Sequence, residues 1–200
     1  MAYEKVKYTT GVTPKGSALF AHVFSPEIYE GKEVGYSIQM KLNKEDTDAL
    51  IAKIDEELDR AKHEMKLKPG QKWSSEPFLS YREDKDGDIV FKFKTNSEVR
   101  FKTGETKKRV VPVYDAHNNI IKDVNIGNGS TVRVAYTIIP YFVSKMINGI
   151  KLRLDAVQVI DLVEFGERSA TSFGFSEEEN GYDGSAAVSS EETFEPDGDF

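Results

Sequence analysis

The sequence predicts a mainly β fold, a Greek-key barrel of five or six strands with one inserted amphipathic helix and an acidic C-terminal segment. Three observations lead to this prediction. Apolar and polar residues alternate with a period of two along several segments rich in β-branched and aromatic residues. One segment instead repeats its apolar residues every three or four positions. From Ser169 onward Ser, Gly, Glu and Asp dominate, and the few apolar residues show no periodicity.

Period-two alternation marks the predicted strands. In the segment IVFKFK, which begins at Ile89, three apolar residues alternate with Lys92 and Lys94, so one face is apolar and the other basic. We expect Phe91 and Phe93, and Phe101 in the next strand, to lie in the core. The predicted strands cover residues 18–24, 34–42, 89–94, 98–102, 131–142 and 150–161. Turn signals at Asp86-Gly87 and Asn128-Gly129 separate apolar runs.

A helix is predicted over about residues 44–66. Asn43 is a good N-cap, and Pro69-Gly70 is expected to end the helix. The apolar residues on its buried face are Leu50, Ile54, Leu58, Ala61 and Met65.

Several twisted strands interrupted by one helix are typical of a small barrel such as the OB-fold. A β-sandwich with an inserted helix is the alternative architecture. We expect residues 1–168 to form the folded domain and residues 169–200 to be a disordered acidic tail. The tail's composition buries too little apolar surface to offset the entropy of ordering the chain.

Charge is distributed unequally between these two parts. All 27 Lys and Arg lie at or before Arg168, whereas nine of the 34 Asp and Glu lie within residues 176–200. Removing those nine acids leaves 25 acids against 27 bases, so the net charge of −7 combines a tail of −9 with a body of +2. Such asymmetry favours a body that binds a polyanion and a tail that interacts with a partner or with the body.

The remaining composition narrows the class of protein. The absence of Cys excludes disulfides and thiolate metal sites. No signal peptide or apolar run of membrane-spanning length is recognised, so we expect a cytosolic protein that does not enter a membrane. No P-loop, nucleophile elbow or metalloprotease motif occurs, and the three His lack metal-ligand spacing. We therefore expect no catalytic residues, no cofactor and no bound metal. The acidic run from Asp84 to Asp88 is better explained by a hairpin turn than by a calcium loop.

Basic residues interleaved with aromatic ones are the strongest local signal. Single-stranded nucleic acid is bound by this combination, because cations follow the phosphates while bases stack on aromatic rings at about 1–3 kcal/mol each. Rings for stacking are available at Trp73, Phe78, Tyr81, Phe101 and Tyr114. The predicted DNA-binding residues are Trp73, Tyr81, Lys92, Lys94, Arg100, Lys102, Lys107, Lys108, Arg109 and Arg133.

Three segments and the C-terminus resemble the single-stranded DNA-binding proteins of tailed phages. Phe24-Ser25-Pro26 followed by the run from Tyr36 to Lys44 is similar to the opening motif of that family before its helix. The segments Val110–Asp115 and Leu154–Val159 resemble two later family motifs. The resemblance extends over roughly residues 18–165, and the acidic tail that ends in Phe200 matches as well.

The resemblance implies a non-catalytic protein with an OB-fold. It implies that the chain coats single-stranded DNA without sequence specificity during phage DNA replication, recombination and repair, in the host cell cytoplasm. The acidic tail would recruit a replicative DNA polymerase or helicase through Asp197, Asp199 and Phe200, and would compete with DNA for the basic surface. Family members exist as monomers or dimers, so a homodimer is possible.

Other functions are compatible with parts of the sequence. A protein-interaction module or DNA mimic would act through the acidic tail and predicts a body without DNA affinity. An RNA-binding OB protein and a metal-dependent nuclease are further alternatives.

Overall fold

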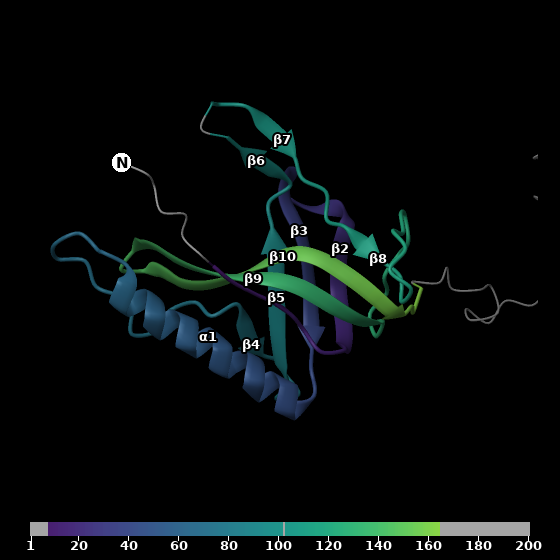
Figure 1. The fold of residues 1–200 in the computed structure, drawn as a ribbon, viewed down its shortest axis with the longest axis horizontal. Helices are drawn as coiled ribbons and strands as arrows, with labels where there is room; N and C mark the ends of the chain where they lie inside the picture. The colour runs from purple at the N-terminus through teal and green to yellow at the C-terminus, as the bar shows by residue number, and fades with distance from the viewer. Residues whose placement is uncertain (1–7, 102, 165–200) are drawn as a thin grey trace, which may run out of the picture. The chain divides into compact units, whose positions relative to one another are not determined.

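The computed structural model describes residues 8–101 and 103–164. This part contains one α-helix and ten strands (Figure 1). The elements are β1 (Thr9–Val12), β2 (Gly16–Tyr29), β3 (Lys32–Lys41), α1 (Lys44–Glu64), β4 (Tyr81–Glu83), β5 (Ile89–Thr95), β6 (Glu98–Arg100), β7 (Thr106–Lys108), β8 (Val113–Tyr114), β9 (Thr131–Ser144) and β10 (Ile147–Asp161).

Five strands form a closed ring in the order β2, β3, β5, β10, β9 and back to β2. Closure depends on β9, which pairs with β10 along nearly its whole length and with β2 through Val132 and Thr131. Neighbours in the ring are antiparallel except β5 and β10, which run parallel. The predicted Greek-key barrel of the OB type is therefore confirmed, and the β-sandwich alternative is wrong because a single sheet closes on itself.

The core fills the barrel interior as the alternation predicted. Phe91 and Phe93 of β5 are fully buried, and β3 contributes Tyr36, Ile38 and Met40. The long strands β9 and β10 complete the core. Their buried residues include Val132, Val134, Tyr136, Ile138, Ile150, Leu152 and Leu154.

Helix α1 covers the barrel with the predicted face. The side chain of Asn43 caps it by accepting a hydrogen bond of 2.8 Å from the Asp46 amide. Leu50, Ile54 and Leu58 are buried in the same core as the strands. The helix ends at Glu64, two residues earlier than predicted, where the chain turns to an extended conformation at Met65. In the described part of the chain no helix is long and apolar enough to cross a bilayer.

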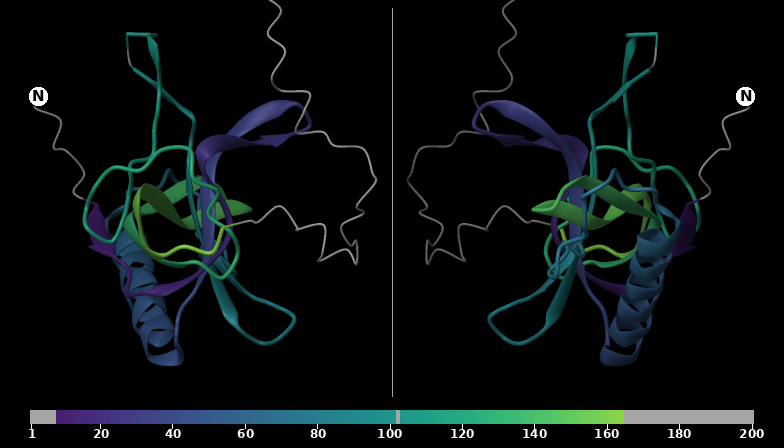
Figure 2. Two further views of the ribbon diagram at one scale, coloured as in Figure 1. Left: turned by 90° about the vertical axis from the view of Figure 1, so that its right-hand side faces the viewer. Right: turned by 90° about the vertical axis from the view of Figure 1, so that its left-hand side faces the viewer.

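The prediction that Phe101 is a core residue is wrong, because its side chain is 47% exposed. After β5 the chain leaves the barrel and forms a separate two-stranded ribbon from β6 and β7. This ribbon, called the arm below, projects away from α1 at the top of Figures 1 and 2. Phe101 follows β6 and has no layer of core side chains to cover it.

Candidate nucleic-acid interface

A basic surface lies on the outside of the barrel where β5 and β10 run side by side. Because Phe91 and Phe93 point inward, the alternation of the strand turns Lys92 and Lys94 outward. Along β10, buried Leu152 likewise separates Lys151 from Arg153. The parallel register places Arg153 beside Lys94. Bases from segments far apart in the sequence are thereby brought together.

A hollow of about 260 Å³, called the lysine pocket below, lies on this surface. Buried Leu152 forms part of its floor, and Ser80 is held there by hydrogen bonds with the backbone of Ile150 (3.0 Å) and Leu152 (3.3 Å). Two aromatic side chains and three lysine side chains complete the lining. The lining residues are Phe78, Ser80, Lys92, Lys94, Tyr141, Lys151 and Leu152.

The lysine pocket combines the two properties that single-stranded nucleic acid requires. Phe78 is 57% exposed, so its ring is open to a planar ligand. Lys92, Lys94 and Lys151 are half-buried and line the same hollow as this ring. The arrangement can bind a base on a π face and the adjoining phosphates by charge.

Electrostatics at the lysine pocket favour an anionic ligand. Burial lowers the pKa of Lys151, and the nearby positive charges of Lys94, Arg109 and Arg153 lower it further. Lys94, Arg109 and Arg153 therefore lie close enough to Lys151 to repel its charge. A phosphate placed among them would relieve the repulsion and raise the pKa of Lys151 again.

Both arginines near Lys151 are held in place by neighbouring side chains. The Arg153 guanidinium donates to Asp155 (2.6 Å) and to the Thr137 hydroxyl (2.9 Å), and that hydroxyl donates to Asp155 (2.5 Å). The Arg109 guanidinium donates to the hydroxyl of Thr95, the last residue of β5. Arg153 therefore has a counter-ion, whereas no ion pair is found for Lys92, Lys94 or Lys151 with the described residues.

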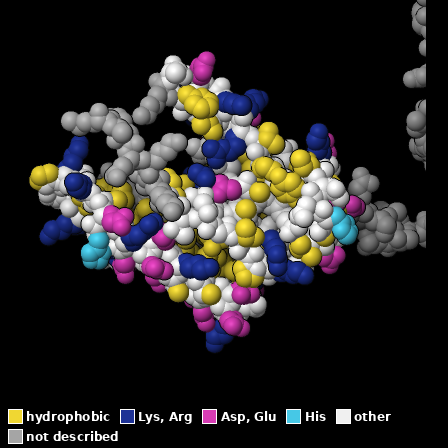
Figure 3. Space-filling model, viewed as in Figure 1, with side chains coloured by type: hydrophobic (Ala, Val, Ile, Leu, Met, Phe, Trp, Pro, Cys, Tyr) yellow, Lys and Arg dark blue, Asp and Glu magenta, His cyan; other side chains and the backbone are white. Residues whose placement is uncertain are grey.

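The arm carries the predicted bases Arg100, Lys107 and Lys108 at exposed positions. Hydrophobic and basic side chains are both visible on its surface (Figure 3). The hydrogen bond from the Arg109 amide to the Ser97 carbonyl (2.7 Å) closes its base. The predicted DNA-binding residue Lys102 lies outside the described residues.

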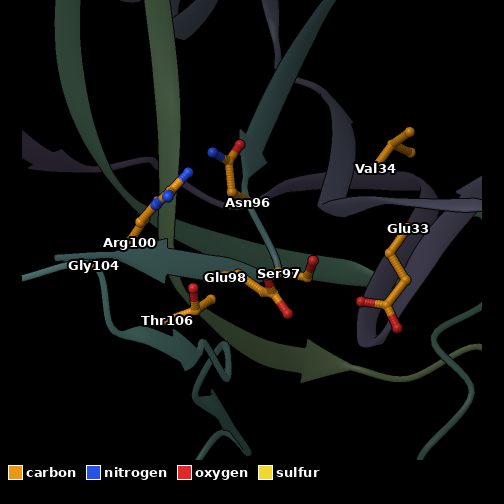
Figure 4. A pocket seen from close by; sticks show the side chains of 8 residues that line it. All are labelled: Glu33, Val34, Asn96, Ser97, Glu98, Arg100, Gly104 and Thr106. Atoms are coloured by element: carbon orange, nitrogen blue, oxygen red, sulfur yellow. The ribbon is translucent and has the colours of Figure 1, made fainter.

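Arg100 also lines a second, larger hollow of about 470 Å³ at the base of the arm (Figure 4). Glu33 and Glu98 share this lining, together with polar groups such as Asn96 and Thr106. Because the lining carries two carboxylates and one guanidinium, the hollow is a poor site for a phosphate backbone. We therefore place the interface at the lysine pocket.

The other predicted residues are dispersed. Tyr81 lies beside the lysine pocket, in an adjoining hollow that shares Phe78, Ser80 and Lys92, and its ring packs against Phe91 with a centroid distance of 5.7 Å. Burial, and to a smaller extent the charge of Asp55, raises the pKa of Tyr81.

Neither Trp73 nor Arg133 lines the lysine pocket. The Trp73 indole is half-buried, 5.5 Å from the ring of Phe142, and its buried Nε1 has no hydrogen-bond partner. Arg133 is exposed on β9, opposite Gln158. It lies four residues, about 13 Å, along the strand from Thr137, the residue opposite Arg153. Asp197, Asp199 and Phe200 lie, with the whole predicted tail, outside the described residues.

Sequence reasoning missed Tyr141, Lys151 and Arg153. The signal was present, since residues 150–161 show the alternation that identified Lys92 and Lys94. Applied to that segment, the same rule turns Lys151 and Arg153 outward opposite Leu152.

Comparison with known proteins identifies the family. The family model described as single-stranded DNA-binding protein, bacteriophage T7, matches residues 31–162. The chain is 28% identical to the single-stranded DNA-binding protein of Enterobacteria phage T3, over 99% of each chain. The fold is similar to the crystal structure of gp2.5, the single-stranded DNA-binding protein encoded by bacteriophage T7, with a TM-score of 0.67, 24% identity, and coverage of 88% of this chain and 98% of that one.

A further solved structure has a similar fold at lower identity. The single-stranded DNA-binding protein of bacteriophage Enc34, in complex with single-stranded DNA, gives a TM-score of 0.53 at 17% identity and covers 78% of this chain and 89% of that one. The family match extends over most of the barrel, from the start of β3 to the end of β10. The chain belongs to the family of single-stranded DNA-binding proteins represented by that of bacteriophage T7.

Proposed function

We propose that this protein binds single-stranded DNA without sequence specificity, with the lysine pocket at the centre of the interface. The observation that carries the proposal is the group of three half-buried lysines, Lys92, Lys94 and Lys151, beside the exposed ring of Phe78. The relatives named above are single-stranded DNA-binding proteins, and one is described in complex with single-stranded DNA.

The location of the lysine pocket in the barrel supports the proposal. OB-folds bind oligonucleotides on the face of their second and third strands, between the loops that join strands one to two and four to five. Counted in chain order, the second and third strands of the ring are β3 and β5, and of these β5 contributes Lys92 and Lys94 to the pocket. The loop between the fourth and fifth strands is the β9–β10 turn at Lys145 and Met146. Tyr141 of the pocket lining lies on β9, three strand residues before that turn.

The chemistry of the lysine pocket explains why binding would be independent of sequence. Ammonium groups attract any phosphate, and an aromatic ring stacks on any base. Each phosphate contacted is expected to add about −0.7 to the slope of log affinity against log salt concentration.

The acidic tail gives the protein its proposed regulation and partners. Its nine acids form an intramolecular polyanion that would occupy the basic surface until DNA displaces it. The freed tail would then recruit a replicative DNA polymerase or helicase, with Phe200 entering an apolar pocket and Asp197 and Asp199 meeting basic residues of the partner.

This role places the protein in phage DNA replication, recombination and repair in the host cell cytoplasm. It would act as a coating protein rather than an enzyme, as a monomer or a homodimer.

Fluorescence anisotropy with labelled oligo(dT) tests the proposal. Full-length protein should bind tightly, duplex DNA should compete poorly, and a chain of residues 1–175 should bind more tightly than the full chain. Adding oligo(U) as competitor distinguishes DNA from RNA preference. A body that binds neither oligonucleotide would contradict the proposal and favour the protein-interaction module. If the full chain and residues 1–175 bind with equal affinity, only the proposed competition by the tail would be contradicted.

A further inference from the structure

The tip of the β9–β10 hairpin exposes a group of apolar side chains that the lysine pocket does not use. Met146 is 88% exposed, Val143 66% and Ile147 56%. The three residues, called the apolar tip below, are separated only by Ser144 and Lys145. Exposed apolar groups in a cluster commonly mark a binding surface, whereas single exposed residues do not.

The apolar tip is presented by a braced hairpin. The buried side chain of Asn148 donates to the carbonyls of Ser144 and Lys145, both at 2.9 Å, and accepts from the Ser74 amide at 3.2 Å. These bonds fix the turn to the chain segment that precedes β4.

The segment before β4 also packs closely along the start of β10. Phe78 donates to the Asn148 carbonyl (3.0 Å) and accepts from the Ile150 amide (2.7 Å). Between them Gly149 has a φ of 146°, and a Cβ there would lie 2.0 Å from the Phe78 carbonyl oxygen. The apolar tip therefore has a fixed position relative to Phe78, which lines the lysine pocket.

The apolar tip and the lysine pocket are continuous along the same two strands. Tyr141 of the pocket precedes Val143 by two residues, about 7 Å along β9. Lys151 follows Ile147 by four residues, about 13 Å along β10. Lys145 adds a cation within the turn itself.

We propose that the apolar tip packs against the last base pair where a bound single strand continues into a duplex. This inference rests on the proposed function, because the single strand must occupy the lysine pocket. The flat face of a terminal base pair is apolar, and apolar side chains insert at base steps in other proteins that unstack DNA. The flexible thioether of Met146 adapts to such a face. Lys145 within the turn and Lys151 farther along β10 favour nucleic acid over an apolar protein surface as the occupant.

The double variant Met146→Ser/Ile147→Thr tests the inference. Its affinity would be measured for oligo(dT) and for the same strand ending in a short duplex, with a fluorescent base analogue at the last pair. Wild type is expected to prefer the junction about tenfold and to brighten the analogue as the pair unstacks. The double variant is expected to lose both effects and to keep its oligo(dT) affinity within about twofold.

Val12→Thr is the matched control, since it also replaces an exposed apolar side chain but lies on β1, opposite Ala135 and far along β9 from the turn. It should behave as wild type, and all three proteins should unfold at similar temperatures. If wild type binds oligo(dT) but shows no junction preference, or if the double variant loses both affinities equally, the inference is wrong. If wild type binds neither ligand, the proposed function itself fails.

Discussion

The lysine pocket and the arm carry the same types of side chain in opposite settings. Lys92, Lys94 and Lys151 are half-buried against an apolar floor, and the pKa of Lys151 is lowered. Lys107 and Lys108 lie on β7 of the two-stranded arm, and both are exposed. Only Asn96 and Ser97 separate β5 from the arm, yet the basic side chains change from half-buried to exposed.

The difference shows how burial of a lysine decides the way its charge interacts with a phosphate. A half-buried ammonium group has already lost part of its hydration, so it forms a short, directional contact with a phosphate at little further cost. An exposed ammonium group remains hydrated and acts mainly over a distance of about one Debye length, roughly 10 Å at 0.1 M salt. The lysine pocket should therefore hold DNA, while the arm attracts it.

The largest effect is expected from removing charge in the lysine pocket. Lys94→Gln/Lys151→Gln should weaken oligo(dT) binding by about 100- to 10,000-fold, because hydrogen bonds to charged groups contribute about 1.5–3 kcal/mol each and two are removed. The loss should persist at high salt and appear as faster dissociation. Lys53→Gln on the exposed face of α1 is the control, and a loss of similar size there would show that only net charge matters.

A smaller effect is expected from the arm. Lys107→Gln/Lys108→Gln should lower affinity about two- to fivefold at low salt, since exposed ion pairs contribute about 0–1 kcal/mol. Stopped-flow kinetics should show slower association with nearly unchanged dissociation, and the effect should vanish at high salt. A large increase in the dissociation rate would show that the arm holds the strand as the lysine pocket does.

The pH dependence of binding separates the two regions further. The pKa of Lys151 is lowered, so this lysine loses its charge earlier than an ordinary lysine as the pH rises. Oligo(dT) affinity should therefore begin to fall at alkaline pH, and binding at that pH should take up protons. Lys151→Arg keeps its charge at high pH and should remove this early fall. An unchanged pH profile in that variant would place the titrating group elsewhere.

The smallest expected effect concerns stability without DNA. A lysine whose pKa is lower in the folded than in the unfolded protein disfavours folding at neutral pH, where both states are charged, and the penalty disappears as the pH rises through the two pKa values. Lys151→Met should therefore raise the unfolding temperature by about 1–3 °C at pH 7. Calorimetry should show this gain shrinking at alkaline pH. A lower melting temperature would mean that the aliphatic part of Lys151 packs better than methionine.

Much of the barrel was predictable because its signals are local. The alternation in residues 89–94 set both the buried phenylalanines and the outward lysines, and Asn43 set the start of α1 correctly. Strands β1, β4, β7 and β8 were missed because two to four residues carry no measurable periodicity. Phe101 was misplaced because alternation shows which residues share a face but not whether a core lies beneath it.

The composition of the lysine pocket was only half predictable. Lys92 and Phe78 were found from their own neighbourhoods, but their proximity to Tyr141 and Lys151 depends on the pairing of β5 with β10 and of β10 with β9. No short motif encodes those registers. They follow from closing the ring, which is a property of the whole domain.

Ring closure also has a consequence for how the protein is made. Gly16 pairs with Val132 and Phe93 with Leu152, so the first and third strands of the ring wait for partners near the end of the domain. Synthesis at about 5–20 residues per second leaves the β2–β3–β5 sheet unfinished for several seconds. Such long-range pairing slows folding. Lys94 and Lys151 come together only when the ring closes. The lysine pocket is therefore absent from a growing chain, and the ability to bind nucleic acid arises in the last step of folding.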